Sequence, residues 1–387
     1  MTVTSFDFTT ANRIVFGRGK LDELPIVIKG FGLKAFIVRS PDPIAFSRLI
    51  PILDNIKLNY ESIIVEGEPT VGSVIRAVNF ARESHCDFVI GIGGGSVIDT
   101  AKVVAALLTN QGELMDYIEV VGKGSPLIKR CAPLIAIPTT AGTGSEVTRN
   151  AVIDVPDKKV KVSMRSSLLL PWVSLIDPLL TLSLPSSVTA FTGMDAFVQV
   201  LEPYVSIKAN CMTDIFCRDG IRKAAQAMLL AYQDGKNENA RIDMSMVSLL
   251  GGLCLANSGL GAVHGFAGVI GGMFHAPHGA ICASLLPSVI KINSDALKER
   301  DPQSQALKRY SEIARIVINN DNATVTDEIN WFKNLCSDLK IPHLRDLNVN
   351  KKDLSEVVKM SQNASSMKGN PIVLTTDELT EILTMAF

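Results

Sequence analysis

The sequence has no excess of charge of either sign. Its 387 residues include 38 Lys and Arg and 39 Asp and Glu, which gives a formal net charge of -1. Nucleic-acid-binding domains usually carry clustered basic residues in surplus, so we expect no nucleic-acid partner. Hydrophobic residues make up 47% and charged residues 20%, a composition that argues against disorder and allows large cores. The length favours two domains.

The sequence also lacks features that mark export or membrane insertion. Its start, MTVTSFDFTT, has no basic region followed by an apolar core, so we expect no secretory signal. The apolar runs are broken by Gly, Pro or charge before the roughly 20 residues that a membrane span requires. Seven Cys occur without CxxC spacing, which is typical of reduced, mostly buried thiols. We therefore expect a cytoplasmic protein without a membrane partner.

Short β-branched runs alternate with helical patterns in the first half of the chain. This alternation predicts a Rossmann-like parallel sheet covered on both faces. Beyond residue 184 the apolar spacing is typical of helices. We thus predict an α/β domain over 1–184 and a helical domain over 185–387. The motifs that follow make the first a candidate dinucleotide-binding domain and the second a candidate metal- and substrate-binding domain. The strand-like runs are 13–17, 34–40, 61–67, 87–95 and 133–145, and the helical patterns are 71–84, 96–110, 188–205, 212–233, 238–259 and 326–339.

The segment DFVIGIGGGSVIDTAK is the clearest local signal in the first domain. An apolar strand ends in a run of glycines, and a helix begins near Ser96. Gly94 and Gly95 would let backbone approach a phosphate, and the helix N-terminus would supply free N–H groups. Because Ser96 fills the last Gly position of GxGxxG, the motif is equally consistent with a tight turn.

A second loop, PTTAGTGSE, also follows an apolar strand and carries hydroxyl side chains suited to phosphate or ribose. Two such strand ends in one parallel sheet lie on the same edge, where ligands bind. Turn capping is the alternative role for these threonines. Lys161 either neutralises a phosphate or carboxylate, or is solvated. The hydroxyl candidates are Thr139, Thr140 and Thr143.

The stretch AFIVRSPDP bears on the choice between NAD and NADP. An acid after an early strand often holds the ribose 2′-hydroxyl of NAD. Here Arg39 and Ser40 come first and Asp42 follows two residues later. Arg39 is therefore either a partner for the 2′-phosphate of NADP or a surface residue.

Histidine is rare, with five in the chain, and three of them lie within fifteen residues in LGAVHGFAGVIGGMFHAPHGA. Earlier, GMDAFVQVLEPYVS places Asp195 and Gln199 four residues apart, on one face of a helix. Imidazole and carboxylate are common ligands of divalent metals. Asp195, Gln199, His264 and His278 therefore predict a metal site. The alternative is a buried hydrogen-bonded pair together with core or turn histidines.

These motifs together resemble the iron-containing (group III) alcohol dehydrogenase family over nearly the whole chain. The resemblance implies a dehydroquinate synthase-like two-domain architecture, NAD or NADP, and one divalent metal, with iron first and zinc or nickel as alternatives. It implies hydride transfer between nicotinamide and a small alcohol or aldehyde in the interdomain cleft, and a homo-oligomer, dimer or higher. The segments that carry it are FGRG, GGGSVIDTAK, PTTAGTGSEVTRNAVI, LIDPLLTLSLP, GMDAFVQVLEPYVS, LGAVHG and PHG.

The resemblance also implies roles for single residues. Asp195, His264 and His278 match three metal ligands, but Gln199 stands where the family usually has a histidine. Because an amide is a weaker ligand than imidazole for a borderline metal, we expect looser metal binding or a changed metal preference. The residues that match the pyrophosphate and nicotinamide contacts are Gly94, Gly95, Ser96, Thr139 and Thr143, with Asp99 and Lys102 completing the motif.

A second departure from the family is Gly268, which stands where a proton-relay histidine is common. His275 is our candidate replacement, and we take it, with His264, as catalytic. Phe266, Val269 and Phe274 are either an apolar pocket wall or core. Two alternatives to the dehydrogenase remain at this stage: a metal-depleted nucleotide-binding relative, and a dehydroquinate synthase-like lyase.

Overall fold

The computed structural model describes residues 5–158 and 160–387. The chain divides into two compact units. The first, Thr9–Thr140 with Gly144–Ser183, is called here the α/β unit. The second, called the helical unit, contains Leu184–Phe387, the described residues up to Phe8, and the short segment Ala141–Thr143.

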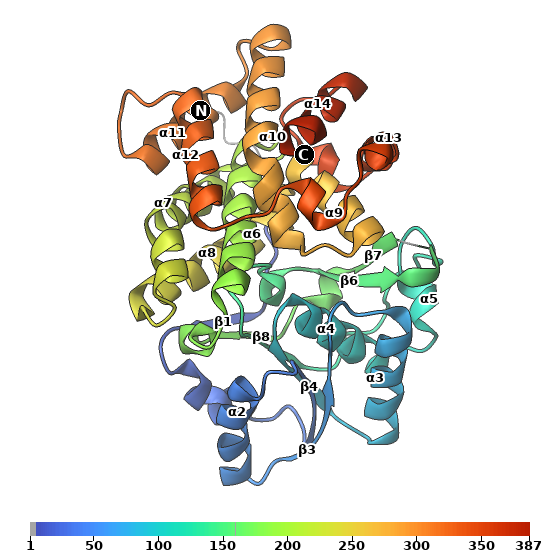
Figure 1. Ribbon diagram of the computed structural model, residues 1–387. Coiled ribbons are helices and arrows are strands. Elements are labelled where there is room, and N and C mark those ends of the chain that lie inside the picture. Colours follow the sequence, from blue (N-terminus) through green and yellow to red (C-terminus); the bar gives the residue numbers. More distant parts are fainter. Residues whose placement is uncertain (1–4, 159) are drawn as a thin grey trace. The chain divides into compact units, whose positions relative to one another are not determined.

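The α/β unit contains a parallel sheet with the strand order β1-β8-β5-β4-β2-β3 (Figure 1). Helices α3 and α4 share one apolar core with one face of the sheet, and α1 and α2 share another core with the opposite face. The sheet predicted from the sequence is therefore confirmed. Its strands are β1 (Arg13–Phe16), β2 (Lys34–Arg39), β3 (Asn59–Ile64), β4 (Phe88–Gly93), β5 (Leu134–Pro138) and β8 (Val173–Ile176); its helices are α1 (Leu24–Val27), α2 (Pro43–Asn55), α3 (Val71–Glu83), α4 (Gly95–Thr109) and α5 (Leu114–Tyr117).

The chain leaves two neighbouring strands of this sheet in opposite directions. From β2 it goes to β3 at the sheet edge, and from β4 it goes to β5 on the other side. Ligands of open α/β sheets bind beyond the carboxyl ends of the strands at such a switch point. An antiparallel hairpin of β6 (Asn150–Val155) and β7 (Val160–Arg165) stands outside the sheet.

The helical unit is built around one apolar core to which all of its helices contribute. In this unit α6 packs against α7, α8 and α10, and α10 in turn packs against α9, α12 and α14. The helices are α6 (Ser186–Val205), α7 (Cys211–Gln233), α8 (Glu238–Ser258), α9 (Ala262–Phe274), α10 (His278–Arg300), α11 (Gln305–Ile318), α12 (Val325–Asp338), α13 (Leu354–Ser361) and α14 (Thr376–Ala386).

Helix α10 is long and apolar enough to meet the length and hydropathy criteria for a membrane span. However, 83% of its apolar window is buried inside the protein. Core helices commonly meet the same criteria, and α10 packs as one.

Candidate metal centre and nucleotide edge

Three polar side chains follow one face of the mostly apolar helix α6. Asp195, Gln199 and Glu202 occupy positions i, i+4 and i+7, which lie on the same side of a helix. Each of them is 3% exposed. Because burying polar groups is costly without partners, this face must meet complementary groups on neighbouring helices.

His264, in the first turn of α9, lies between two of these carboxylates. Its Nδ1 is 2.7 Å from Oε2 of Glu202, and its Nε2 is 3.2 Å from Oδ1 of Asp195. The other oxygen of Glu202 accepts the backbone N–H of Val263 at 2.6 Å. Glu202 therefore satisfies a free N–H at the start of α9 and fixes the imidazole on the same helix.

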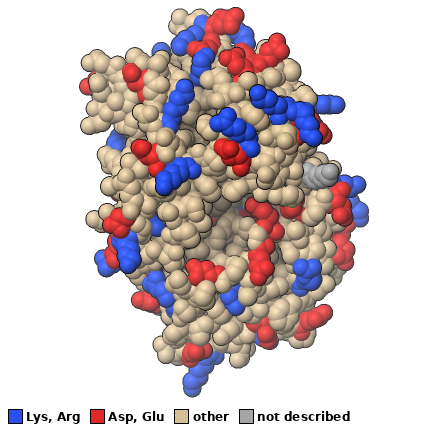
Figure 2. Space-filling view, in the orientation of Figure 1, with Lys and Arg blue, Asp and Glu red and all other residues tan. Residues whose placement is uncertain are grey.

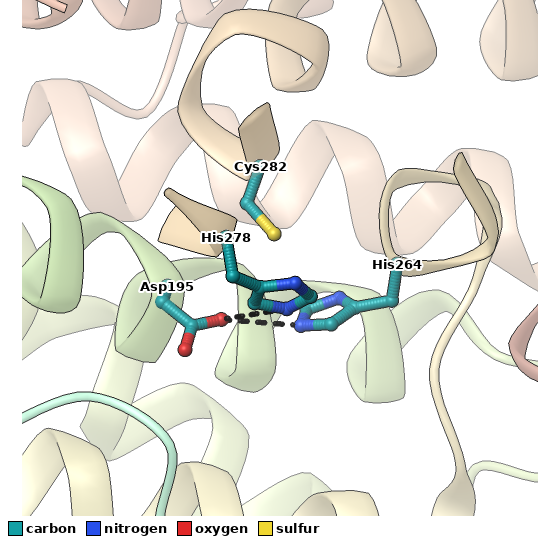
Figure 3. A group of neighbouring side chains, drawn as sticks. All are labelled: Asp195, His264, His278 and Cys282. Atoms are coloured by element: carbon teal, nitrogen blue, oxygen red, sulfur yellow. Dashed lines mark hydrogen bonds and ion pairs between the residues drawn. The ribbon is translucent and has the colours of Figure 1, made fainter. Parts of the chain in front are cut away.

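His278 and Cys282 reach the same place from α10, one helical turn apart (Figure 3). Nε2 of His278 lies 3.8 Å from Oδ1 of Asp195, and the two histidine rings lie 5.4 Å apart between their centres. One ligand atom from each of Asp195, His264, His278 and Cys282 lies within 4.8 Å of the others. The side chain of His278 is 36% exposed, so this face of the cluster is open.

The electrostatics of the cluster favour a cation. Burial opposes ionisation of Asp195, but the hydrogen bond from His264 and the charges of both histidines outweigh it and hold the pKa of Asp195 below its usual value. Burial likewise opposes protonation of His264, yet hydrogen bonds to Asp195 and Glu202 raise the pKa of His264 to about 9. Burial and the two nearby carboxylates raise the pKa of the Cys282 thiol well above its usual value. Two buried carboxylates here thus require positive charge beside them.

Gln199 contributes a buried acceptor to this region. Its Nε2 donates to the backbone carbonyl of Gly142 at 3.4 Å, whereas its Oε1 is buried and has no hydrogen-bond partner among the described residues. An unpaired buried carbonyl oxygen costs about 1 to 3 kcal/mol. A cation at this centre would supply the missing partner.

Two glycines allow the helices to approach the cluster closely. A Cβ at Gly279, next to His278, would lie 2.0 Å from the backbone oxygen of Phe191 in α6. A Cβ at Gly261 would lie 2.9 Å from Oε1 of Glu202. The Gly residues in LGAVHG and PHG therefore place both histidine helices against α6.

The glycine run of β4 and the threonines after β5 meet at the carboxyl edge of the sheet in the α/β unit. The backbone N–H of Thr139 donates to the carbonyl of Gly93 at 3.0 Å, and a Cβ at Gly94 would lie 3.4 Å from the side chain of Thr140. Gly94 is the N-cap of α4, and no side chain of the described residues caps this helix end, so the first N–H groups of α4 are available to an anion. Gly95 and Ser96 begin the helix, and both are half-buried.

Asp99 and Lys102 lie beneath this edge, inside the α/β unit. Nζ of Lys102 donates to Oγ of Ser145 at 3.0 Å, to Oγ1 of Thr148 at 2.9 Å and to the carbonyl of Asn150 at 2.7 Å. Asp99 accepts from the hydroxyl of Ser145, and its carboxylate lies 3.6 Å from Lys102. The predicted cofactor role of this pair stays a prediction, and their contacts indicate that they would act by shaping the loop after β5.

The end of β2 stands at the switch point. The backbone N–H of Ser40 donates to the carbonyl of Ile92 in β4, so Ser40 is next to the glycine run. The guanidinium of Arg39 lies 4.4 Å from the ring centre of Phe46, and its Nε is buried without a partner among the described residues. Asp42 accepts the backbone N–H of Ile44 as the N-cap of α2.

The remaining residues that the sequence suggested for the site lie in several different places. Lys161, in β7, is only 10% exposed and pairs with Glu68 at 3.1 Å, so it is not the solvated lysine of the alternative interpretation. Thr143 belongs to the short segment that clusters with the helical unit. His275 is exposed and ends α9 in the left-handed conformation, with φ of 53°, and it is not part of the ligand cluster. Phe266 is fully buried and therefore core, whereas Val269 and Phe274 are partly exposed.

Sequence reasoning missed two residues of the centre. Glu202 follows Asp195 at i+7 in the same helix, and Cys282 follows His278 at i+4. Helical spacing from a predicted ligand was the signal that could have found both.

The α/β unit has the topological switch point at which nucleotides bind to open α/β sheets. The helical unit has a cluster of atoms of the kinds that bind metals. This combination is typical of nicotinamide-linked, metal-dependent oxidoreductases. Sequence comparison supports this class. Residues 11–178 match the profile of iron-containing alcohol dehydrogenase, and residues 189–387 match the C-terminal profile of the Fe-containing alcohol dehydrogenase family.

Individual relatives and solved structures lead to the same class of protein. The chain is 37% identical over 396 residues to alcohol dehydrogenase 4 of Schizosaccharomyces pombe, covering 100% of this chain and 90% of that protein. It is similar to the solved alcohol dehydrogenase from Oenococcus oeni, with 31% identity, a TM-score of 0.91 and coverage of 99% and 100%. It is also similar to sulfoacetaldehyde reductase from Bifidobacterium kashiwanohense in complex with NAD+, with 26% identity, a TM-score of 0.87 and coverage of 98% of each chain.

The chain therefore belongs to the iron-containing alcohol dehydrogenase family. It is a metal-dependent, NAD(P)-linked oxidoreductase that acts on alcohols. The comparisons support neither the metal-depleted nucleotide-binding protein nor the dehydroquinate synthase-like lyase.

Proposed function

We propose that this chain interconverts small aliphatic alcohols and aldehydes with NADP(H), using a metal held by Asp195, His264, His278 and a further ligand. The observation that carries the proposal is a cluster in which a carboxylate oxygen of Asp195 and ring nitrogens of His264 and His278 lie within 4.8 Å of one another. We further propose that residues 1–184 bind the dinucleotide and residues 185–387 bind metal and substrate.

The residues fit a divalent metal. Asp195 supplies an ionised oxygen, and His264 and His278 supply nitrogens, a donor set that suits iron, zinc or nickel. Oε1 of Gln199 is a buried acceptor without a hydrogen-bond partner among the described residues, so Gln199 is one candidate for the further ligand. When bound, the metal would polarise the substrate oxygen and the nicotinamide would donate or accept hydride.

The chain's own residues have three tasks in this proposal. Glu202 fixes the Nδ1–H tautomer of His264, so that Nε2 faces the centre. His278 lines the open side, where a substrate oxygen could enter. Val269 and Phe274, both partly buried, offer apolar surface that would suit an aliphatic substrate.

NADP(H) is favoured over NAD(H) at the end of β2. Asp42 already caps α2, and Ser40 stands beside the glycine run in place of an acid. Arg39 carries a positive charge at this position, and its buried Nε has no partner among the described residues. The positive charge would attract a 2′-phosphate, whereas a 2′-hydroxyl would lack the carboxylate that usually binds it.

The test is metal content and turnover of purified protein. About one divalent metal per chain is expected, together with NADPH oxidation by simple aldehydes that ceases after chelation. His264→Ala and His278→Ala should each lose both properties. The exposed His343→Ala is the matched control and should retain them. Unchanged metal content and turnover in both ligand variants would show that the metal assignment is wrong.

We also propose which partners this protein has and where it is located. On the face in Figure 2, Lys and Arg are interspersed with Asp and Glu, which accords with the expectation of no nucleic-acid partner. The family resemblance favours a homo-oligomer, dimer or higher, and the thiols favour a cytoplasmic location without a membrane partner. Light scattering of the purified protein would test the oligomer.

A further inference from the structure

The thiol of Cys282 lies with the ligand atoms of the metal centre. Cys282 is fully buried and follows His278 by one turn of α10. In Figure 3 its sulfur faces the two imidazole rings. A buried cysteine usually packs as a small hydrophobe, but this one shares a 4.8 Å cluster with a carboxylate and two imidazoles.

The spacing suits one tetrahedral ion. Zinc bonds are about 2.3 Å to sulfur and about 2.0 to 2.1 Å to nitrogen, so donors around one zinc ion lie roughly 3.3 to 3.6 Å apart. Atoms already within 4.8 Å of one another need only a small contraction to reach this geometry. Of the other thiols in the helical unit, those of Cys217 and Cys254 contact each other at 3.4 Å.

We infer that Cys282 supplies a thiolate to this metal, in the place that the family usually gives to a histidine, and that the centre therefore prefers zinc to iron. The inference rests on the metal dependence proposed above. The replacement of histidine by Gln199 leaves one strong donor missing, because an amide oxygen is a weak ligand for a borderline metal. A thiolate is a strong donor, and it selects zinc over harder ions.

Binding of the metal by Cys282 releases one proton. The S–H bond of Cys282 breaks, a metal–sulfur bond forms with the sulfur electron pair, and the proton passes to solvent. No oxidant or reductant is involved. Gln199 is then left to hold Asp195 and the segment of Gly142 in place.

X-ray absorption of the zinc-loaded protein tests the inference without measuring activity. The wild type should show one sulfur neighbour at about 2.3 Å beside nitrogen and oxygen neighbours at about 2.0 to 2.1 Å. Cys282→Ala and Cys282→Ser should lose the sulfur neighbour. In competition dialysis, the preference for zinc over iron should fall at least about tenfold in both variants.

Cys254→Ala is the matched control, because it removes a buried thiol of the same unit outside the cluster and should retain the sulfur neighbour. A wild-type protein that binds zinc only through nitrogen and oxygen would overturn this inference and leave the proposed function standing. A wild type that binds no divalent metal would overturn both. The wild-type spectrum decides these cases even if a variant fails to fold.

Discussion

Glu202 is the residue on which the position of His264 depends. It contacts both the ring Nδ1 and the N–H of Val263. Removing such a carboxylate partner typically costs 10- to 100-fold in metal affinity. We expect Glu202→Gln to weaken zinc binding within about this range and Glu202→Ala to weaken it more, as measured by competition with a chromophoric chelator.

The control for this prediction is Glu356→Gln, an exposed change in α13 that removes the same charge from the same unit. It should leave zinc affinity unchanged. Equal affinities in the wild type and Glu202→Gln would mean that the carboxylate does not orient the ligand.

The proposed preference for NADP(H) depends on Ser40 and Arg39 at the residue scale. A carboxylate at position 40 would accept the hydroxyls of the NAD ribose and repel a 2′-phosphate. We expect Ser40→Asp to weaken NADPH binding at least about tenfold and to strengthen NADH binding, and Arg39→Ala to weaken NADPH binding alone. Fluorescence titration gives both dissociation constants.

Lys29→Ala removes an exposed positive charge from the same unit and serves as the control for general electrostatics. It should leave the ratio of the two constants unchanged. A wild type that binds NADH more tightly than NADPH would contradict the proposed cofactor preference.

Gly268 offers room for the histidine that this chain lacks. It is exposed on α9, and a Cβ there would meet no atom of the described residues within 4 Å. Replacing a helical glycine also gains roughly 0.3 kcal/mol. Gly268→His should therefore fold normally and add a group that titrates near about 6.5 to the pH profile of turnover.

Gly268→Ala separates the imidazole from the gain in helix stability. It should raise the thermal midpoint as Gly268→His does, while its pH profile follows that of the wild type. Identical pH profiles for the two variants would show that an imidazole at this position does not relay protons.

At the scale of elements, α12 contains a buried carboxyl group. Both side-chain oxygens of Glu328 are buried without a partner among the described residues. Burial raises the pKa of Glu328 well above its usual 4.5, so the folded state keeps a proton that the unfolded chain loses above that pH. The stabilisation that comes from this retained proton is therefore fully present below pH 4.5. It is lost as the pH rises toward the raised pKa of the folded state.

Glu328→Gln removes this ionisation and should make the protein more stable than the wild type at pH 8, with little difference near pH 4.5. The wild type should lose up to about 1.4 kcal/mol per pH unit more than the variant. Urea unfolding at both pH values measures the difference. Parallel pH dependences would show that Glu328 ionises normally in the folded protein.

Helices α6, α9 and α10, which carry the candidate metal ligands, show what the sequence could and could not predict. Asp195, His264 and His278 stood out because charged groups and histidines are rare in apolar, Gly-rich stretches. Glu202 did not stand out, because a glutamate near a helix end is ordinarily exposed. Cys282 did not either, because a cysteine in an apolar helix is ordinarily core.

The strands of the α/β unit were likewise predictable only in part. Continuous apolar runs ending in Gly, Pro or Ser predicted β1 to β5 because parallel strands are buried on both faces. No run predicted β8, the remaining strand of the central sheet. The segment DKKVKVSMRSSLLLP predicts one further strand and a turn, whereas the structure forms β7 there and pairs it with β6, which the sequence did not predict, in a hairpin. The strand order, and with it the switch point beside Ser40, depends on contacts distant in sequence that no local pattern contains.

At the scale of the whole molecule, the two ligands should stabilise different parts. Binding stabilises the state that binds by about 2.7 kcal/mol at a ligand concentration 100 times the dissociation constant. In hydrogen exchange, zinc should slow exchange in α6, α9 and α10, and NADPH should slow it in α4 and the loop after β5. Chelation should reverse only the first effect, and equal protection of all peptides by either ligand would contradict the separate sites.

The division of the chain also has a consequence for synthesis on the ribosome, where domains fold as units from the N-terminus. Every strand of the parallel sheet precedes Ser183, so the α/β unit can form while the helices are still being translated. The segment Ala141–Thr143 is the exception, because Gly142 contacts Thr192 and Gln199 of α6. The loop after β5 therefore stays incomplete until α6 emerges, and the metal centre is finished later still, once α10 has been made.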